Sequence, residues 1–208
     1  MTEKKEQVVM QQSPGQQEEN VVVEIVKTLV TAAILAFGIR TFVAEARYIP
    51  SESMQPTLEI NDRLIIEKIS YRFRTPERGD VVVFRPTEEL KKQGYKEAFI
   101  KRVIGLPGDT VEVKNDKVFV NNKELPEKYI FVPEVAPGYQ ARPQRPYGPT
   151  TVPDDQYLVL GDNRNNSLDS RSWGFVPREN LIGRATVRFW PLQRLGSLDE
   201  KPIYPVKN

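Results

Sequence analysis

The chain has 208 residues, carries 30 Lys and Arg against 28 Asp and Glu, and contains no histidine or cysteine. This length fits one domain with an insertion, and the net charge of +2 gives no electrostatic footprint for nucleic acid, so no nucleic-acid partner is expected. Without cysteine, disulfides and thiol catalysis are excluded. Without histidine, a serine nucleophile must take its base from a lysine, a carboxylate or a terminal amine.

The amino-terminal region divides into a polar tail and an apolar run. Residues 1–20 are rich in Gln, Glu and Lys, which predicts a disordered tail. Residues 21–44 are strongly apolar, and 28–39 carry no charge. A helix of this length spans a bilayer, with Lys27 and Arg40 placed to reach the two interfaces. We therefore predict one transmembrane anchor over residues 21–44.

Two alternatives to the anchor remain open. A cleavable export signal has a similar apolar stretch, and the sequence AEA at 44–46 has the small-x-small form of a cleavage site, although the acidic tail and Arg40 argue against it. A soluble amphipathic helix would need a polar face, which residues 29–39 lack. The flanking positive charges do not determine the orientation of the segment.

Two serines follow the apolar run, in the proline-bounded stretch PSESMQPTL at residues 50–58. Each proline fixes φ at roughly −65° and removes a backbone donor, so the stretch is neither an interior helix turn nor a central strand. It presents Ser51 and Ser53 on a stiff loop, where either is a candidate nucleophile. The alternative is a linker between tail and domain.

Beyond residue 60, short runs rich in Val, Ile, Phe and Tyr alternate with turn residues, without a long helical pattern. This predicts a mainly β fold, with an antiparallel β-sheet core and an inserted smaller region. The predicted strands cover residues 63–68, 80–84, 98–104, 110–113, 117–120, 156–160 and 184–190. Asn115 and Asp116 suit a tight hairpin turn between two of them.

Two hydrophilic stretches interrupt the strand pattern. Residues 87–97 are expected to form a charged loop, and residues 133–153 contain six prolines, which are expected to prevent regular pairing. Strand pattern resumes on both sides of the second stretch. We therefore predict one β-rich domain over residues 47–208, with an insertion at about 118–153.

A lysine on an apolar strand face is a candidate base. Strand alternation places Phe99, Lys101 and Val103 on one face, where lost hydration lowers the lysine pKa from about 10.4 toward neutrality. Arg102 cannot serve, because guanidinium keeps its proton. Lys68 is a competing candidate, and a solvated edge-strand lysine is the ordinary alternative for Lys101.

The stretch GDNRNNSLDSR at residues 161–171 is dense in hydrogen-bonding side chains. Arg164 would occupy a ligand position of a calcium loop, whose turn glycine is also missing, so no metal is expected there. Either the stretch is a polar surface turn, or Ser167 holds a neutral lysine while Asp169 and Arg171 pair to brace the loop.

Four stretches together resemble, in sequence and order, the motifs of type I signal peptidases, the membrane-bound Ser-Lys proteases that remove export signals. They are SESMQPTL (51–58), RGDVVVF (78–84), IKRVIGLPGD (100–109) and GDNRNNSLDSR (161–171). The resemblance implies a β catalytic core, signal peptides of exported preproteins as substrates, and no cofactor. It also implies a single-pass protein of the cell membrane or an internal energy-transducing membrane, with its catalytic domain on the non-cytoplasmic side. The lipid bilayer and the export machinery would be further partners.

The resemblance also implies residue roles. Ser53 looks like the nucleophile and Lys101 like the general base, while Ser51 and the Ser53 backbone N–H resemble an oxyanion hole. The lysine-orienting and supporting residues would be Ser167, Asp169 and Arg171. The substrate groove would be lined by Ile49, Pro50, Met54, Leu58, Val83, Phe99 and Ile100. Leu168 stands where some relatives carry a smaller residue, which is expected to reshape the pocket.

Two other functions stay open. A self-cleaving Ser-Lys repressor would share the dyad, but it needs a DNA-binding helix-turn-helix that the amino-terminal region lacks. A non-catalytic, membrane-tethered β module would use the serine loop only to join anchor and domain. Replacement of Ser53 would abolish the activity of an enzyme but would have no effect on a binding module, which catalyses no reaction.

Overall fold

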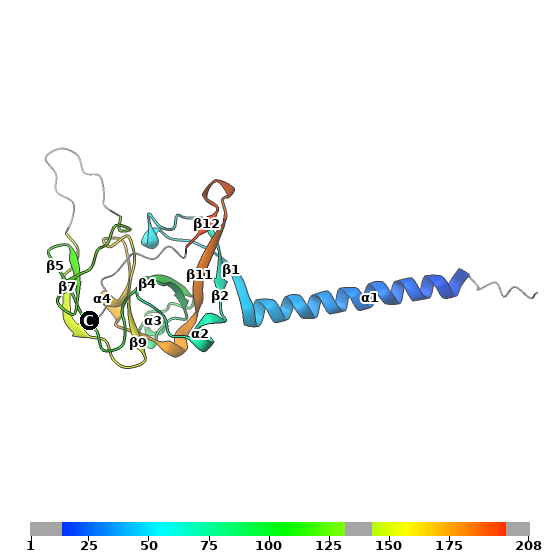
Figure 1. Ribbon diagram of the computed structural model, residues 1–208, viewed down its shortest axis with the longest axis horizontal. Coiled ribbons are helices and arrows are strands. Elements are labelled where there is room, and N and C mark those ends of the chain that lie inside the picture. The colour runs from blue at the N-terminus through cyan, green and yellow to red at the C-terminus, as the bar shows by residue number, and fades with distance from the viewer. Residues whose placement is uncertain (1–13, 132–142, 199–208) are drawn as a thin grey trace, which may run out of the picture. The chain divides into compact units, whose positions relative to one another are not determined.

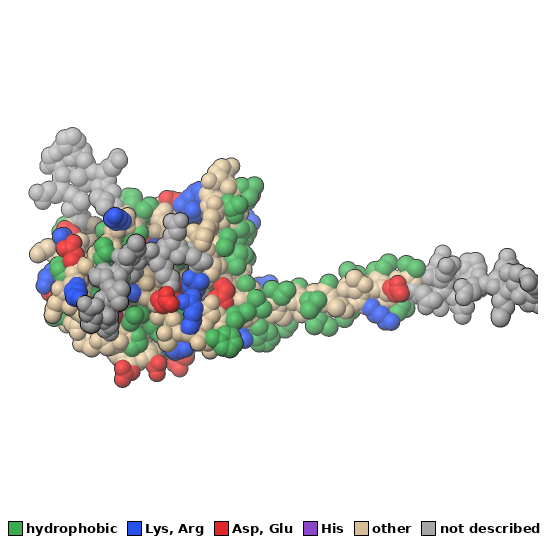
Figure 2. Space-filling model, in the orientation of Figure 1, with side chains coloured by type: hydrophobic (Ala, Val, Ile, Leu, Met, Phe, Trp, Pro, Cys, Tyr) green, Lys and Arg blue, Asp and Glu red, His purple; other side chains and the backbone are tan. Residues whose placement is uncertain are grey.

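The computed structural model describes residues 14–131 and 143–198 (Figure 1). The chain divides into two units, Met1–Thr41 and Phe42–Asn208. The first contains α1, Pro14–Gly38, which continues into the π-helical turn η1, Ile39–Val43. Within the described residues, Val21–Val43 is the one helical segment long and apolar enough to cross a membrane, with a mean hydropathy of 2.0. Figure 2 shows hydrophobic side chains along this helix.

Helix α1 covers part of the predicted amino-terminal tail. Disorder was expected over residues 1–20, but α1 begins at Pro14. Proline suits the first turn of a helix, because its φ is already helical and it has no N–H to leave unsatisfied. Residues 1–13 lie outside the described residues.

The second unit is built on an eight-stranded antiparallel sheet, which confirms the predicted mainly β fold. The strands run in the order β1-β2-β11-β3-β4-β9-β10, and β12 pairs with β11. Their bounds are β1 Ala44–Tyr48, β2 Arg63–Glu67, β3 Val81–Phe84, β4 Phe99–Gly105, β9 Gln156–Leu160, β10 Val176–Pro177, β11 Leu181–Trp190 and β12 Gly196–Ser197.

A second, four-stranded sheet has the order β7-β6-β5-β8. Its strands are β5 Thr110–Lys114, β6 Lys117–Val120, β7 Lys123–Glu124 and β8 Tyr147–Thr151. Asn115 and Asp116 have φ of 50° and 61°, as the predicted hairpin turn between β5 and β6 requires. The second sheet begins at Thr110, because β5 pairs with β6 and β8, whereas the predicted insertion covers about residues 118–153.

The proline-rich stretch at residues 133–153 contains a strand that the sequence did not predict. β8 pairs with β5 and is an edge strand of the second sheet. On an edge strand a proline can place its missing N–H on the side that faces solvent, so no hydrogen bond between strands is lost. The register shifts where Gly148 and Pro149 lie, which is the irregularity that such residues favour. Residues 132–142 of this stretch lie outside the described residues.

Short helical turns occupy the connections: η2 Glu52–Met54, α2 Ser70–Phe73, α3 Glu88–Lys92, α4 Ser170–Trp173, η3 Arg178–Asn180 and η4 Leu192–Arg194. The expected charged loop at residues 87–97 contains α3. The Thr87 hydroxyl accepts a hydrogen bond from Leu90 N, and glutamates begin the helix while lysines end it. These charges complement the helix dipole, which explains a helical turn here.

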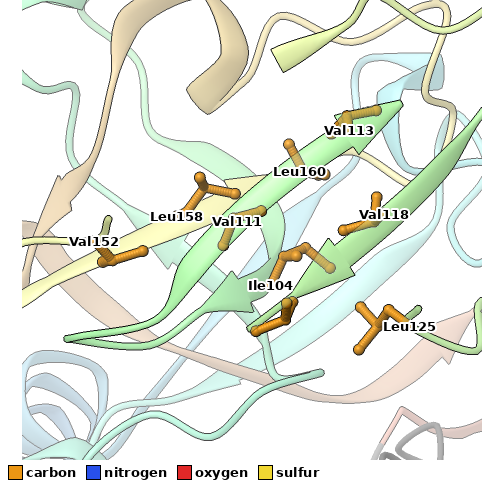
Figure 3. Close-up of a cluster of buried hydrophobic side chains, with 9 residues drawn as sticks. Ile104, Val111, Val113, Val118, Leu125, Val152, Leu158 and Leu160 are labelled. Carbon is orange, nitrogen blue, oxygen red and sulfur yellow. The ribbon is translucent and has the colours of Figure 1, made fainter. Parts of the chain in front are cut away.

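Among the described residues, three clusters of buried side chains hold the second unit together. One lies between the two sheets, where Ile104, Leu158 and Leu160 of the main sheet meet valines of β5 and β6 (Figure 3). Another cluster receives Met54 and Leu58 from the serine loop. Burial of such a side chain contributes about 1.5–3 kcal/mol, so the loop is attached to the sheet through its apolar residues.

One close approach within the main sheet predicts a stability effect. A Cβ at Gly183 would lie 2.2 Å from the Glu67 carbonyl oxygen, a backbone atom that cannot turn aside. Gly183→Ala is therefore expected to destabilise the protein by about 1–3 kcal/mol, measured as a lower thermal midpoint by circular dichroism. Gly196→Ala in β12 is the control, since its nearest neighbour is 3.9 Å away. Equal midpoints for the two variants would contradict this packing.

Candidate active site

The serine loop holds Ser53 in a defined position. Ser53 lies in the turn η2 and is 8% exposed, while Met54 beside it is fully buried. Leu58 N donates to the Met54 carbonyl at 2.9 Å, and Asn163 N donates to the Ser53 carbonyl at 3.1 Å. The loop is therefore fixed from within and by the 161–171 loop. Ser53 lines a cleft.

Lys101 reaches this hydroxyl from the main sheet. Its Nζ lies 2.7 Å from Ser53 Oγ and 2.8 Å from the Ile100 carbonyl oxygen. β3 pairs with β4 at Lys101, which fixes the strand that carries it. The competing candidate Lys68 instead forms an ion pair with Glu45 at 2.6 Å. The structure thus brings Lys101 to the serine, a choice that strand periodicity left open.

The surroundings of Lys101 favour its neutral form. Burial lowers the pKa of the Lys101 ammonium to about 8, although the carboxylates of Asp169 and Asp162 oppose this change. The Phe99 ring, whose centroid lies 5.7 Å from Nζ, also opposes this change through a cation–π contact that favours the ammonium. A substantial fraction of the protein therefore holds a neutral amine against Ser53 near pH 8.

A buried ion pair joins the segments that carry these groups. Arg102 Nε donates to Asp162 Oδ1 at 2.9 Å, and its Nη2 donates to Oδ2 at 2.6 Å. Thr57 of the serine loop donates its hydroxyl to the same Oδ2 at 2.6 Å. Asp162 therefore binds both the strand of Lys101 and the loop of Ser53.

The 161–171 loop is braced by Asp169 and Arg171, which form the expected pair. Arg171 Nε donates to Asp169 Oδ1 at 2.9 Å, and Nη2 donates to Oδ2 at 2.8 Å. Asp169 also accepts from Gly161 N at 3.1 Å and from Arg171 N at the start of α4. One carboxylate thus holds both ends of the loop.

Ser167 does not make the hydrogen bond to Lys101 that the sequence predicts. Its Oγ is buried and has no hydrogen-bond partner among the described residues, while Lys101 Nζ bonds to Ser53 Oγ and donates to the Ile100 carbonyl. Ser167 packs instead against Gly161. A Cβ at Gly161 would lie 2.2 Å from Ser167 Oγ and 2.4 Å from the Ser53 carbonyl oxygen. Only glycine lets the two loops approach this closely.

The cleft beside Ser53 and Lys101 has a volume of about 520 Å³. Pro50, Phe99 and Ile100 of the predicted groove line it, together with Ser51 and Leu168. Sequence reasoning missed the lining residues Glu52, Ile60, Tyr95, Glu97, Ala98 and Asn166. Glu52 and Asn166 lie within motif stretches and Ala98 is next to Phe99, a signal that could have found these three.

The other predicted groove residues lie elsewhere. Ile49, Met54, Leu58 and Val83 are at most 3% exposed and belong to the core cluster beneath the serine loop. They do not line the cleft. Their apolar side chains point inward because the same loop and strand must bury one face to stay attached to the sheet.

Two further features of the cleft bear on its chemistry. The Ser51 hydroxyl lies 3.3 Å from Ser53 Oγ, on the exposed side of the loop. Residues 99–101 of β4 pair with β3, whereas pairing with β9 begins only at Arg102. Within the described part of the chain, β4 therefore has a free edge beside the serine.

Comparison with known proteins gives consistent matches. Residues 22–190 match the family model described as signal peptidase, peptidase S26. The chain is 65% identical over 182 residues to a probable signal peptidase I-2 from Synechocystis sp., covering 88% of this chain and 79% of the relative. It is 61% identical over 183 residues to a signal peptidase I from Leptolyngbya laminosa, covering 87% and 86%. The crystal structure of a signal peptidase I from Enterococcus faecalis is 31% identical, with a TM-score of 0.44, and covers 53% of this chain and 97% of that chain.

The buried lysine predicts a pH-dependent stability. Its pKa of about 8 in the folded protein lies below the unfolded value of about 10.4. Below pH 8, Lys101 therefore lowers the free energy of unfolding by about 3 kcal/mol, and this loss disappears as pH rises through 10.4. Lys101→Met should therefore exceed the parent in free energy of unfolding at pH 7, with the excess shrinking between pH 8 and 10.4. Urea titrations measure both values.

Lys114→Met is the control for this stability difference, because Lys114 is half exposed on the second sheet. It should follow the parent at every pH. An excess for Lys101→Met that stays constant from pH 7 to 10.4 would contradict the lowered pKa.

Proposed function

This chain belongs to the signal peptidases of peptidase family S26, serine proteases that cleave signal peptides, and we propose that Ser53 is its nucleophile and Lys101 its general base. The observation that carries the proposal is the 2.7 Å separation of Lys101 Nζ and Ser53 Oγ in a chain without histidine or cysteine. Neither a self-cleaving repressor nor a non-catalytic binding module is favoured.

The proposed reaction is acyl transfer. Neutral Lys101 takes the Ser53 proton through its lone pair, while an N–H of the same amine donates to the Ile100 carbonyl and keeps it oriented. Ser53 Oγ attacks the scissile carbonyl, and the ammonium then protonates the leaving amine. Neutral Lys101 next takes a proton from water, which hydrolyses the acyl-enzyme and regenerates Ser53.

The oxyanion of the intermediate would be bound by the Ser51 hydroxyl and the Ser53 backbone N–H. Support comes from the position of Ser51, whose Oγ is 3.3 Å from the attacking oxygen. One such donor is typically worth about 3 kcal/mol to the transition state.

The signal peptide would bind as an extended strand along the free edge of β4 at residues 99–101. Backbone hydrogen bonds to this edge would hold it, while its side chains enter the cleft. Leu168, Phe99 and Ile100 line that cleft, where the small residues before the cut would bind. Asp169 and Arg171 would support the site by bracing the 161–171 loop.

The protein is membrane-associated, and its finer placement is part of the proposal. Val21–Val43 would be a single-pass anchor in the cell membrane or an internal energy-transducing membrane, with the catalytic unit on the non-cytoplasmic side, where exported preproteins emerge. The pairing of Ala44–Tyr48 with β2 supports an uncleaved anchor, because cleavage after Ala46 would divide strand β1. The bilayer and the export machinery would then be its partners.

Replacement of the two reacting groups tests the proposal. Ser53→Ala and Lys101→Arg should each lower preprotein cleavage by about 10³-fold or more, because the first removes the nucleophile and the second a base that can lose its proton. Cleavage is followed with the detergent-solubilised full chain and a preprotein substrate. Ser172→Ala and Lys68→Arg are the matched controls and should cleave normally. Normal turnover by Lys101→Arg would remove Lys101 from the mechanism.

The pH profile gives an independent check of the base. Because Lys101 must be neutral to accept a proton and its pKa is about 8, kcat/KM should rise about tenfold per pH unit below 8 and level off above it. The profile is measured between pH 6 and 10 with a peptide that does not titrate in this range. A profile without an ascending limb would contradict a lysine base.

A further inference from the structure

A segment from the inserted region crosses the loop that supports the site. Residues 125–131, here named the strap, follow β7 directly. Leu125 is buried in the cluster between the sheets, and its N–H donates to the Val118 carbonyl at 2.8 Å. At the other end, Phe131 N donates to the Asp162 carbonyl at 3.0 Å. The strap is thus attached to the second sheet and to the 161–171 loop.

Glu127 in the strap forms a buried two-point ion pair with Arg164. Arg164 Nη1 donates to Glu127 Oε2 at 2.7 Å, and Nη2 donates to Oε1. The Arg164 side chain is 2% exposed and the Glu127 side chain is 5% exposed. Arg164 Nε also donates to the Gly161 carbonyl at 3.0 Å, and the Arg164 carbonyl accepts from Arg171 at 2.6 Å. Arg164 is therefore held at three points.

Tyr129 connects this ion pair to the strand of the lysine. Its hydroxyl donates to Glu127 Oε1 at 2.9 Å, and its ring centroid lies 4.2 Å from the Arg102 guanidinium carbon. Arg102 follows Lys101 in β4. The contacts therefore run continuously from Arg102 through the strap to Arg164.

The two arginines flank the groups that react. Arg102 is the neighbour of Lys101, and Arg164 is the neighbour of Asn163, whose N–H binds the Ser53 carbonyl. A two-point arginine–carboxylate pair fixes the direction of both groups. A buried ion pair adds little stability compared with apolar packing. The fixed orientation of the two side chains is therefore the property that gives this pair a role at the site.

We propose that Glu127 and Tyr129 are positioning residues for signal-peptide cleavage, which hold the strand of Lys101 and the 161–171 loop in register with Ser53. This inference rests on the proposed roles of Ser53 and Lys101. Neither Glu127 nor Tyr129 lines the cleft, so they act through the two arginines and do not touch the substrate.

A loosened strap has a defined chemical consequence. Movement of the 161–171 loop shifts the carboxylates of Asp162 and Asp169 and admits water to Lys101. The other carboxylates that line the cleft are Glu97 and Glu52, and Glu52 accepts a hydrogen bond from Asn166 of the same loop. Displacement of the two aspartates lowers the pKa of Lys101, whereas hydration favours the ammonium and raises it. Burial is the largest cause of the lowered pKa, so hydration decides the sign and the midpoint of the pH profile rises. Turnover falls because the amine and the hydroxyl separate, while substrate binding at the cleft is little affected.

Variants of the strap test the inference in the detergent-solubilised full chain. Glu127→Gln and Glu127→Asp should lower kcat about tenfold, leave KM within about twofold and raise the pH midpoint by about half a unit. Tyr129→Leu should act in the same direction and more strongly than Tyr129→Phe, which keeps the ring over Arg102. Glu124→Gln is the control, because Glu124 pairs with Lys117 on the exposed surface of the same region and should behave as the parent.

The outcomes separate this inference from the proposed function. Folded Glu127→Asp and Tyr129→Leu variants with parental kcat and pH midpoint would overturn the positioning role, provided that Ser53→Ala is inactive in the same assay. Cleavage retained by Ser53→Ala would instead overturn the proposed function. If Glu127→Gln fails to fold, the other variants decide. Loss of folding in all of them, judged by thermal midpoint, would assign the strap a purely structural role and overturn the inference.

Discussion

The buried ion pair between Arg102 and Asp162 is the interaction on which the arrangement of the site depends. Asp162 accepts from Arg102 of β4 and from Thr57 of the serine loop, and both partners of the pair are almost completely excluded from water. Removal of one partner would leave an uncompensated buried charge, which is far more costly than loss of a surface pair. The pair therefore constrains three segments that are distant in sequence to a single geometry.

The exclusion of water that strengthens this pair also lets Lys101 act as a base, and it lowers the stability of the protein. A lysine beside Ser53 is a base only when neutral, and burial is the main cause that lowers its pKa. The buried lysine lowers the free energy of unfolding. The buried apolar residues of the serine loop raise it, and they also keep the hydroxyl in place. Stability and reactivity are thus opposed at Lys101, while they act together at Met54 and Leu58.

Part of the site could be predicted from residue types and part could not. In a chain without histidine and cysteine, a serine nucleophile with a lysine base is one of the few pairs available. The prolines around Ser53 indicated a stiff loop. Alternation along strands did not separate Lys101 from Lys68, because both lie on predicted strands with apolar neighbours. The resemblance to signal peptidases implied that Ile49, Met54, Leu58 and Val83 line the groove, but they belong to the core. An apolar side chain of a core and one of a binding surface look alike in sequence.

The sequence by itself determined the chemistry available and the elements that carry it: a serine, a lysine, short antiparallel strands and one apolar segment of membrane-spanning length. These follow from composition and local periodicity, which act between near neighbours. Only the tertiary structure decided which lysine meets Ser53, that Ser167 packs on Gly161, and that the strap joins Arg164 to Arg102. Those contacts depend on strand order and register across the sheet, and no local pattern contains that information.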